Sequence, residues 1–210
     1  MTTIFETFAE GVHAVVVRED LAILDTRSDA YLCLPGAAAS VAANAHGIAP
    51  GPVADSLRAS GLLGPRPPET LAPVALPSMT IFHDRTPAPL GRADLARGWG
   101  VWRDLKRARA TPGLEGFLAL AGHDGDRTPD AVLAAARRFT RLAPWLPIEG
   151  ECLVRSAMLV SYLRRCGLRA DWVFAVRLWP FAAHCWVQCG EICLNDDVER
   201  LAPYTPILVT

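Results

Sequence analysis

A stretch dense in proline divides this chain and most constrains how it can fold. Between Gly64 and Gly91 the prolines are Pro65, Pro67, Pro68, Pro73, Pro77, Pro87 and Pro89. Proline fixes φ and lacks a backbone N–H, so this stretch cannot be one long helix or an interior strand. The sequence therefore predicts two folded units, residues 1–64 and 92–210, joined by an extended linker over residues 65–91. A proline-rich loop lying across one domain is the alternative.

The first unit has the pattern of three short strands followed by two helices. Residues 12–18, 21–25 and 30–34 are strand-like and are separated by short polar turns. Helices are expected over residues 37–46, ending at Gly47, and from Pro52 to a stop at Gly61. This pattern predicts a small winged-helix-like module with a binding role. Its notable side chains, His13, Cys33 and His46, are expected to be structural or exposed.

The second unit reads as helices followed by strands, which indicates an α+β fold with helices packed on an antiparallel sheet. Helices are expected over residues 94–110, 128–142 and 152–165, the last ended by Gly167 as a left-handed cap. The helix over 152–165 is apolar nearly all round, which is typical of a buried central helix. Strands are expected over residues 172–178, 184–189, 192–194 and 207–209.

Cys152 follows Gly150-Glu151 at the predicted start of that buried helix. A thiol there lies beside unsatisfied N–H groups and the positive end of the helix dipole, which favour the thiolate, the nucleophilic form. Taken alone, a cysteine is more often a small core residue. Cysteine catalysis also needs a histidine that moves the proton and a third group that orients the histidine. His184, on a predicted strand, and an aspartate after the next strand have the types required.

The loop between those two strands decides which aspartate faces His184. A three-residue loop centred on Gly190 places Asp196 opposite His184, and a two-residue loop, Gly190-Glu191, places Asp197 there. Directly opposed side chains stand about 5 Å apart at Cβ, close enough for a carboxylate to hold an imidazole. Geometry from the sequence leaves both aspartates open. The candidate set is Cys152 as nucleophile, His184 as base and Asp196 or Asp197 as orienting acid.

The other cysteines of this region do not indicate a metal site. Cys185, Cys189 and Cys193 lie four residues apart, which is not the paired spacing of structural zinc. On the predicted strand, Cys185 and Cys189 face away from His184. We expect buried apolar thiols, no metal and no cofactor. Trp172, Trp179 and Trp186 are expected in the core or in groove walls, with Trp186 on the same face as His184.

Composition narrows the partners and the compartment. The formal charge is −1, with 21 basic and 22 acidic residues, and gives no general reason to expect nucleic acid as a partner. No apolar run approaches the ~20 residues of a membrane helix. Residues 1–6 lack the pattern of a secretory signal, and the chain has six cysteines. We therefore expect free thiols in a reducing cytoplasm, with neither nucleic acid binding nor membrane insertion.

Three motifs in order resemble the lasso-peptide B proteins, transglutaminase-like cysteine proteases that cut the leader from a ribosomally made precursor. They are Cys152-Leu153-Val154-Arg155-Ser156, then Pro180-Phe181-x-Ala183-His184-x-Trp186-Val187, then Asn195-Asp196. The resemblance implies a transglutaminase/papain-like domain with Cys152 as nucleophile, His184 as base and Asp196, not Asp197, as orienting acid. Two departures are Cys185, where the family usually has Ala, and Gln188, where it often has Glu.

The first unit is similar to the leader-recognition module that some of these proteins carry at the N-terminus. In that module the leader adds as a strand beside the third strand and packs against the last helix, which is β-augmentation. The resemblance implies leader contacts at Tyr31, Leu32, Cys33, Val53 and Leu57. It also implies two partners, the precursor peptide and an asparagine-synthetase-like lasso cyclase. The cyclase must be a separate polypeptide, because this chain has no nucleotide motif.

Two other functions stay open. The same triad serves amide exchange, in which an amine attacks the acyl-enzyme in place of water. A non-catalytic carrier that delivers the precursor would need none of these groups, so Cys152→Ala separates it from an enzyme.

Overall fold

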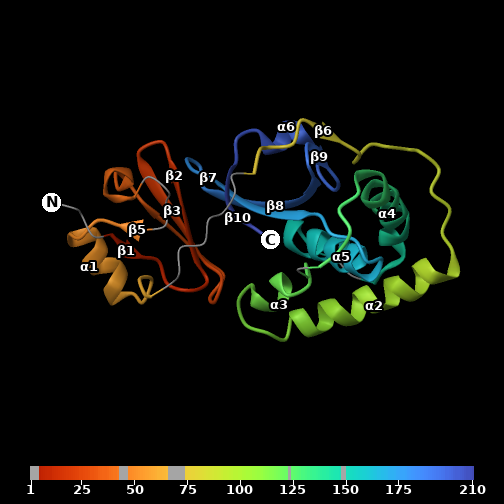
Figure 1. Cartoon of the computed structure of the whole chain (residues 1–210), viewed down its shortest axis with the longest axis horizontal. Coiled ribbons are helices and arrows are strands. Elements are labelled where there is room, and N and C mark those ends of the chain that lie inside the picture. Colours follow the sequence, from red (N-terminus) through yellow and green to blue (C-terminus); the bar gives the residue numbers. More distant parts are fainter. Residues whose placement is uncertain (1–4, 43–46, 66–73, 123, 148–149) are drawn as a thin grey trace.

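The computed structural model describes residues 5–42, 47–65, 74–122, 124–147 and 150–210. Figure 1 shows a small β-rich part at the N-terminal end, a layer of helices at the other end, and the strands β7, β8 and β10 between them. None of the helices in these residues is both long and apolar enough to cross a bilayer.

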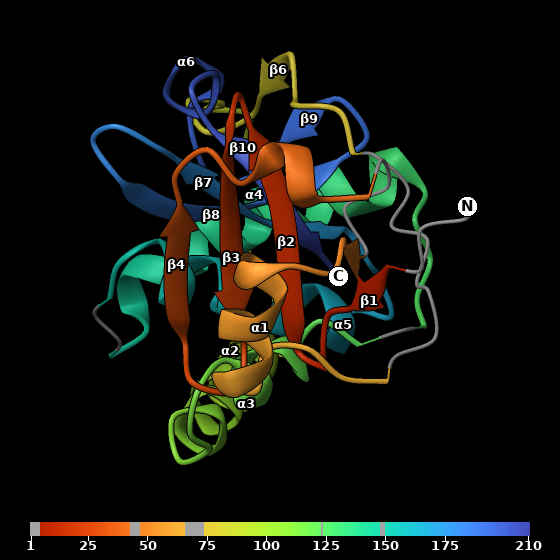
Figure 2. The ribbon, with the colours of Figure 1, turned by 90° about the vertical axis from the view of Figure 1, so that its left-hand side faces the viewer.

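The N-terminal part is built on an antiparallel meander in the order β2-β3-β4. Its strands are β2 (Val12–Val17), β3 (Asp20–Asp25) and β4 (Ala30–Leu34). The short strands β1 (Glu6–Thr7) and β5 (Gly47–Ile48) pair beside it. Helix α1 (Pro52–Ala59) covers one face of the meander, as Figure 2 shows. The three predicted strands and the helix that begins at Pro52 are confirmed, but the winged-helix assignment stays a prediction.

The predicted helix over residues 37–46 is wrong. Only a short 3-10 turn, η1 (Ala38–Ser40), forms there, and Val41 then adopts an extended conformation and bridges to Ile48. A β-branched valine that pairs with a neighbouring strand outweighs the helix propensity of the alanines before it. Residues 43–46, which include His46, lie outside the described residues.

Strand β3 is buried along its whole length because both faces of the meander are covered. Leu21 and Ile23 pack under α1 in a core of their own. On the opposite face, Ala22 and Leu24 join the core of the second unit. The Leu114 N–H also donates to the Thr26 carbonyl at 2.8 Å. The N-terminal part is therefore docked on the second unit through shared core packing.

The second unit contains a five-stranded sheet in the order β10-β7-β8-β9-β6. Its strands are β6 (Met79–Thr80), β7 (Asp171–Arg177), β8 (Ala182–Cys189), β9 (Ile192–Cys193) and β10 (Thr205–Val209). Its helices are α2 (Arg92–Ala108), α3 (Glu115–Leu118), α4 (Pro129–Leu142), α5 (Cys152–Arg165) and α6 (Val198–Leu201), and η2 (Ala143–Trp145) follows α4. The strands and long helices expected in this unit are confirmed to within a few residues.

Helix α5 is the central helix, packed between the sheet and the helices α2 and α4. Polar contacts fix it against α2: the Tyr162 hydroxyl donates to the buried Asp94 at 2.6 Å, and the Arg165 guanidinium donates to Asp104 at 2.8 Å. Gly100 permits this approach, since a Cβ there would lie 2.3 Å from the Arg165 guanidinium. These contacts hold the helix whose first residue is Cys152.

The proline-rich segment is not a free linker over its whole length. Residues 66–73 lie outside the described part, but residues 74–91, here called the strap, lie along the second unit. Met79–Thr80 form the edge strand β6 beside β9, and Arg137 of α4 pairs with Asp84 at 2.7 Å. The Gln188 side chain donates to the Ala75 carbonyl at 3.0 Å. The prolines of the strap flank an edge strand of only two residues, where no ladder hydrogen bond is lost.

Candidate active site

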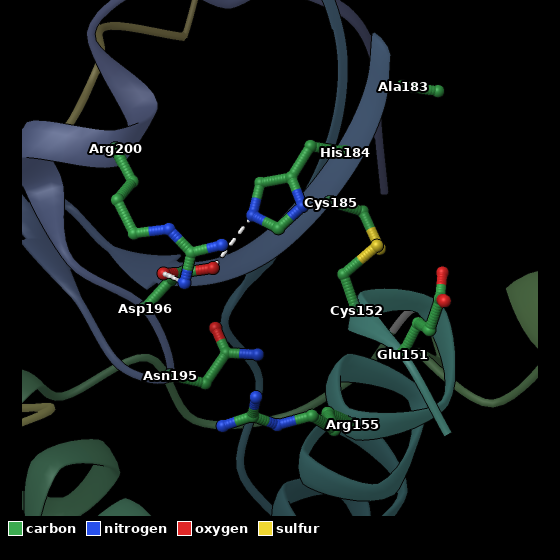
Figure 3. A pocket seen from close by; sticks show the side chains of 9 residues that line it. All are labelled: Glu151, Cys152, Arg155, Ala183, His184, Cys185, Asn195, Asp196 and Arg200. Atoms are coloured by element: carbon green, nitrogen blue, oxygen red, sulfur yellow. Dashed lines mark hydrogen bonds and ion pairs between the residues drawn. The ribbon is translucent and has the colours of Figure 1, made fainter.

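Three side chains from separate elements meet in one cleft. Cys152 is the first residue of α5, His184 lies on β8, and Asp196 follows β9. The His184 Nε2 lies 2.7 Å from the Asp196 Oδ2. Figure 3 shows the other ring nitrogen turned toward the two cysteines. The cleft is a cavity of about 310 Å³ lined by Glu151, Cys152, Arg155, Ala183, His184, Cys185, Asn195, Asp196 and Arg200.

The chain conformation before α5 presents Cys152 to the cleft. Glu151 is the extended N-cap residue, and its side chain makes no capping hydrogen bond. The first-turn N–H groups of Cys152 and its neighbours have no partner within the helix, as at any helix start. A Cβ at Gly150 would lie 2.5 Å from Val154, so the chain can pass this close to the helix only with glycine there. Cys152 itself is half-buried, which leaves its sulfur within reach of a substrate.

The surroundings of Cys152 favour the thiolate. The Cys185 thiol, the His184 imidazole and the Cys185 backbone N–H act together against burial and lower the pKa of Cys152 to about 4. Hydrogen bonds to Asp196 and to Cys152 raise the pKa of His184 to about 9. Between these values the pair exists as thiolate and imidazolium, which is the reactive form of a cysteine nucleophile with its proton donor.

The β8–β9 hairpin has the two-residue loop, because Cys189 pairs with Ile192 and Gln188 with Cys193. Extended further, this register would have placed Asp197 opposite His184. Of the two loops that the sequence left open, the two-residue loop is thus the one that forms, although the resemblance had implied Asp196. The pairing ends at Leu194, whose N–H donates to the Val187 carbonyl at 2.8 Å. The chain then leaves the sheet, and this departure brings Asp196 to His184.

Asn195 causes that departure. Its side-chain oxygen accepts the Val187 N–H at 2.8 Å in place of a backbone carbonyl, and its amide donates to the Ser156 hydroxyl at 2.9 Å. Ser156 in turn donates to the Cys185 carbonyl at 3.3 Å. The chain of bonds ties α5, β8 and the segment after β9 together around the cleft. No role was predicted for Asn195 from the sequence, although its position directly before Asp196 indicated that it lies close to the site.

The two aspartates have different partners. Burial raises the pKa of the Asp196 carboxyl, but the His184 hydrogen bond and the Asp197 N–H outweigh burial and keep it below its usual value. Arg200 adds a cation 3.4 Å from Asp196. Asp197 instead lies 3.1 Å from the His83 ring of the strap. Of these two aspartates, Asp196 is therefore the one bonded to His184.

Aromatic side chains close the far side of the histidine. Trp186 is fully buried on the same face of β8 as His184, with ring centroids 6.3 Å apart, and its N–H donates to Gln188 at 2.7 Å. The Tyr204 ring lies 5.4 Å from the His184 ring. Trp172 is buried in the core, whereas Trp179 is 68% exposed. Trp186 and Tyr204 therefore shield one side of the imidazole from water.

All six cysteines are unpaired, and Cys185, Cys189 and Cys193 are buried as expected. The sequence did not reveal that Cys185 faces Cys152 (Figure 3). Strand alternation turns Cys185 away from His184 and toward the α5 side of the sheet, where Cys152 lies. Among the described residues, no group of three or more His, Cys, Asp or Glu side chains could hold a metal ion.

The five residues implied in leader contact do not share one surface. Ala22 and Leu24, which pair with Cys33 and Tyr31, face the second unit, so Tyr31 and Cys33 face it too. Leu32 lies on the α1 side and is 41% exposed. The other two, on α1, differ in burial: Val53 is half-buried, whereas Leu57 is buried in the core under the helix. Of these five residues, Leu32 and Val53 are the two that are accessible on the α1 side.

Tyr31 links the N-terminal part to the cleft. Its ring packs on Phe181 of the β7–β8 loop with centroids 5.7 Å apart. Burial raises the pKa of its hydroxyl, and the nearby charges of Asp29, Cys185 and Cys152 add to the rise. The inner face of β4 thus contacts the loop that leads into the strand of His184.

Comparison with known proteins gives a family for this fold and site. Residues 102–209, just over half of the chain, match the model of the transglutaminase-like superfamily. No curated protein and no solved structure matches the chain. The matched segment contains α4, α5 and the sheet strands β7 to β10, and with them Cys152, His184 and Asp196. The protein belongs to the transglutaminase-like superfamily.

Proposed function

We propose that this protein is a cysteine peptidase that removes the leader from a ribosomally made lasso-peptide precursor. The observation that carries the proposal is the meeting of Cys152, His184 and Asp196 in an open cleft. The lowered pKa of Cys152 and the raised pKa of His184 support the chemistry, and the three-motif resemblance supports the substrate class.

In the proposed reaction, the Cys152 thiolate attacks the carbonyl carbon of the scissile amide. The free N–H of Cys152 at the start of α5 stabilises the negative oxygen that forms. The His184 imidazolium then gives its proton to the departing amine. Water hydrolyses the remaining thioester, with neutral His184 as the base. Asp196 holds the His184 ring orientation throughout and stabilises its charge.

The N-terminal part is proposed to bind the leader as an added strand. In the described residues β4 is at the edge of its sheet with no partner strand on its outer side. Leu32 on β4 and Val53 on α1 offer apolar contacts for the leader's side chains on the α1 side of the meander. A leader bound there would pass Phe181, three residues before His184 on the same chain segment. Binding beside the cleft would raise the local concentration of the scissile bond.

The ring-closing step belongs to a partner in this proposal. That partner is a separate asparagine-synthetase-like cyclase acting on the freed core peptide. Hydrolysis releases a new α-amine at the start of the core, and this amine is the group that a cyclising enzyme joins to a side-chain carboxyl. The peptidase therefore acts first.

The test is to mix the purified protein with each short peptide encoded beside its gene and to weigh the products by mass spectrometry. Two fragments whose masses sum to the precursor plus one water support the proposal. Cys152→Ala and His184→Ala should each abolish cleavage while leaving leader affinity unchanged. If the wild type binds a precursor peptide but cleaves none, the protein is a carrier, and if Cys152→Ala cleaves as well as the wild type, Cys152 is not the nucleophile; either result contradicts the proposal.

Adding hydroxylamine to the same reaction separates hydrolysis from amide exchange. Both reactions pass through the Cys152 thioester, so only the acceptor differs. A product carrying the amine in preference to water, at low amine concentration, would assign the protein to acyl transfer and overturn the peptidase assignment.

The leader-binding edge has its own test. Leu32→Glu places a charge at the proposed strand-addition site and should weaken binding of a leader peptide at least tenfold, measured by fluorescence anisotropy. Leu95→Glu is the matched control, because Leu95 is 58% exposed on α2 and outside both proposed sites. Equal losses in the two variants, or none in Leu32→Glu, would contradict strand addition at β4.

A further inference from the structure

Two thiols from different elements face each other at the cleft. Cys152 begins α5 and is half-buried, whereas Cys185 lies on β8 and is 3% exposed. Figure 3 shows their side chains pointing toward one another beside the His184 ring. Cys185 stays protonated because its hydrogen bond to Cys152, its burial and the Cys152 charge raise its pKa well above the usual value. The pair is thus a thiolate next to a thiol.

Catalysis by Cys152, His184 and Asp196 needs no second thiol. A small apolar side chain would fill the core position of Cys185 equally well. Three of the other cysteines, Cys33, Cys189 and Cys193, are less suited to oxidation, because burial raises the pKa of their thiols. Oxidants select the thiol that is most ionised and accessible, and here that thiol is Cys152.

We propose that Cys152 and Cys185 form a peroxide-sensitive dithiol whose disulfide reversibly switches off the nucleophile. This modification site goes beyond the proposed function and depends only on the reactivity of Cys152, whatever its substrate.

The reaction balances with one hydrogen peroxide. The Cys152 thiolate attacks one peroxide oxygen, the O–O bond breaks, and the leaving hydroxide takes the proton of the His184 imidazolium and departs as water, giving a sulfenic acid on Cys152. The Cys185 sulfur then attacks the Cys152 sulfur, the S–O bond breaks, and a second water leaves with the thiol proton. Two thiols lose two electrons to the peroxide, and a dithiol reductant reverses the change.

The neighbouring Cys185 thiol also protects Cys152 from irreversible oxidation. A sulfenic acid without a neighbouring thiol is oxidised further to the sulfinic acid, which dithiols do not reduce. With Cys185 in contact, condensation competes with that second oxidation. The disulfide covers the Cys152 sulfur until it is reduced, so activity is suspended rather than lost.

The experiment treats the whole protein with a small excess of hydrogen peroxide at neutral pH, without reductant. Intact mass should fall by about 2 Da, the two hydrogens lost in a disulfide. Peptide mapping should link the peptide of Cys152 to that of Cys185. Alkylation of Cys152 by iodoacetamide should stop after peroxide and return after dithiothreitol. These readouts need no peptide substrate, so they stand or fail separately from the peptidase assignment.

Cys185→Ala and Cys185→Ser remove the second thiol, and circular dichroism checks that each variant folds. Both should gain about 32 Da at Cys152 under peroxide, the mass of two oxygens, and dithiothreitol should not restore alkylation. Cys189→Ala is the matched control, since Cys189 is buried on the same face of β8, and it should behave as the wild type. The proposal is overturned if the wild type gains oxygen as fast as Cys185→Ala does, or if peroxide links a different pair.

Discussion

At the scale of single residues, the site depends on how one sulfur and one imidazole share charge. Cys185 and His184 stabilise the Cys152 thiolate, and Asp196 stabilises the His184 imidazolium. Each group therefore shifts its neighbour's pKa in the direction that keeps the ion pair at neutral pH. The Asp196 contact of 2.7 Å is the strongest support for the charged imidazole.

The ion pair predicts a bell-shaped pH dependence of kcat/KM. Activity should rise with the thiolate through the Cys152 pKa of about 4 and fall as the His184 proton is lost through about 9. Asp196→Asn removes the largest cause of the raised His184 pKa, so the alkaline limb should move to lower pH. The same variant should lower kcat by up to about 10⁴-fold, as for an orienting carboxylate.

Asp197→Asn is the control for that measurement, since Asp197 bonds His83 and not His184. It should leave the position of the alkaline limb unchanged. A shifted limb in Asp197→Asn with none in Asp196→Asn would show that the wrong aspartate is assigned.

At the scale of elements, the end of β9 and the start of α5 shape the cleft. Asn195 closes the β8–β9 pairing and bonds Ser156 of α5, so one side chain joins two elements. Beside it, the strap and the helices α4 and α5 enclose a second cavity of about 500 Å³. The Asn195 bonds and this cavity therefore both lie at contacts between α5 and its neighbouring segments.

Asn195→Ala should affect stability and catalysis together. The variant leaves the buried Val187 N–H without its acceptor, which costs about 1–3 kcal/mol in the free energy of unfolding. It also frees the segment that carries Asp196, so kcat should fall more than KM changes. Urea unfolding and steady-state kinetics measure the two effects. Loss of stability with unchanged kcat would mean that Asn195 does not position Asp196.

The second cavity predicts a preference for a large apolar side chain near the scissile bond. Its walls include Phe82, Phe139 and Met158, and it shares Arg155 and Asn195 with the cleft of Cys152. Cleavage of an internally quenched peptide library should therefore favour aromatic or aliphatic residues at one position beside the cut.

Ala143→Trp tests this cavity, because Ala143 lines it and indole would fill part of it. KM for the favoured peptides should rise severalfold, while the rate of Cys152 alkylation stays the same. Ala110→Trp, at an exposed position beyond α2, is the control. An unchanged preference in Ala143→Trp would place the substrate elsewhere.

At the scale of the whole molecule, the N-terminal meander is part of one folded body with the second unit. Ala22 and Leu24 of β3 are buried in the core that also contains α5 and β7. Trp179 of the β7–β8 loop donates to Asp20 at 2.8 Å across the same junction. The proposed leader edge therefore has a fixed position relative to the cleft.

Shared packing predicts that the two parts unfold together. Leu24→Ala opens a cavity at the junction and should cost about 2–5 kcal/mol. Hydrogen exchange followed by mass spectrometry should show the same loss of protection free energy in peptides from β3 and from β7. Loss confined to the β3 peptides would show that the meander opens on its own.

Local sequence patterns were enough to predict most of the secondary elements and the identity of the candidate groups. The helix from Cys152 to Arg165, the strand that contains His184 and the meander in residues 12–34 follow from local patterns of apolar residues, proline and glycine. Such patterns reflect interactions between residues that are close together in the sequence, so they can be recognised without the fold. The failed helix over residues 37–46 depended instead on the pairing of Val41 with Ile48.

Which of these groups meet depends on how the elements pack in three dimensions. Asp196 reaches His184 because Asn195 ends the β9 pairing, although the register of the hairpin favours Asp197. Cys185 faces Cys152, and residues 74–91 pack as a strap, because separate elements come together around α5. Contacts between distant parts of a chain are set by packing and by competition for hydrogen bonds, and no local pattern in the sequence encodes them.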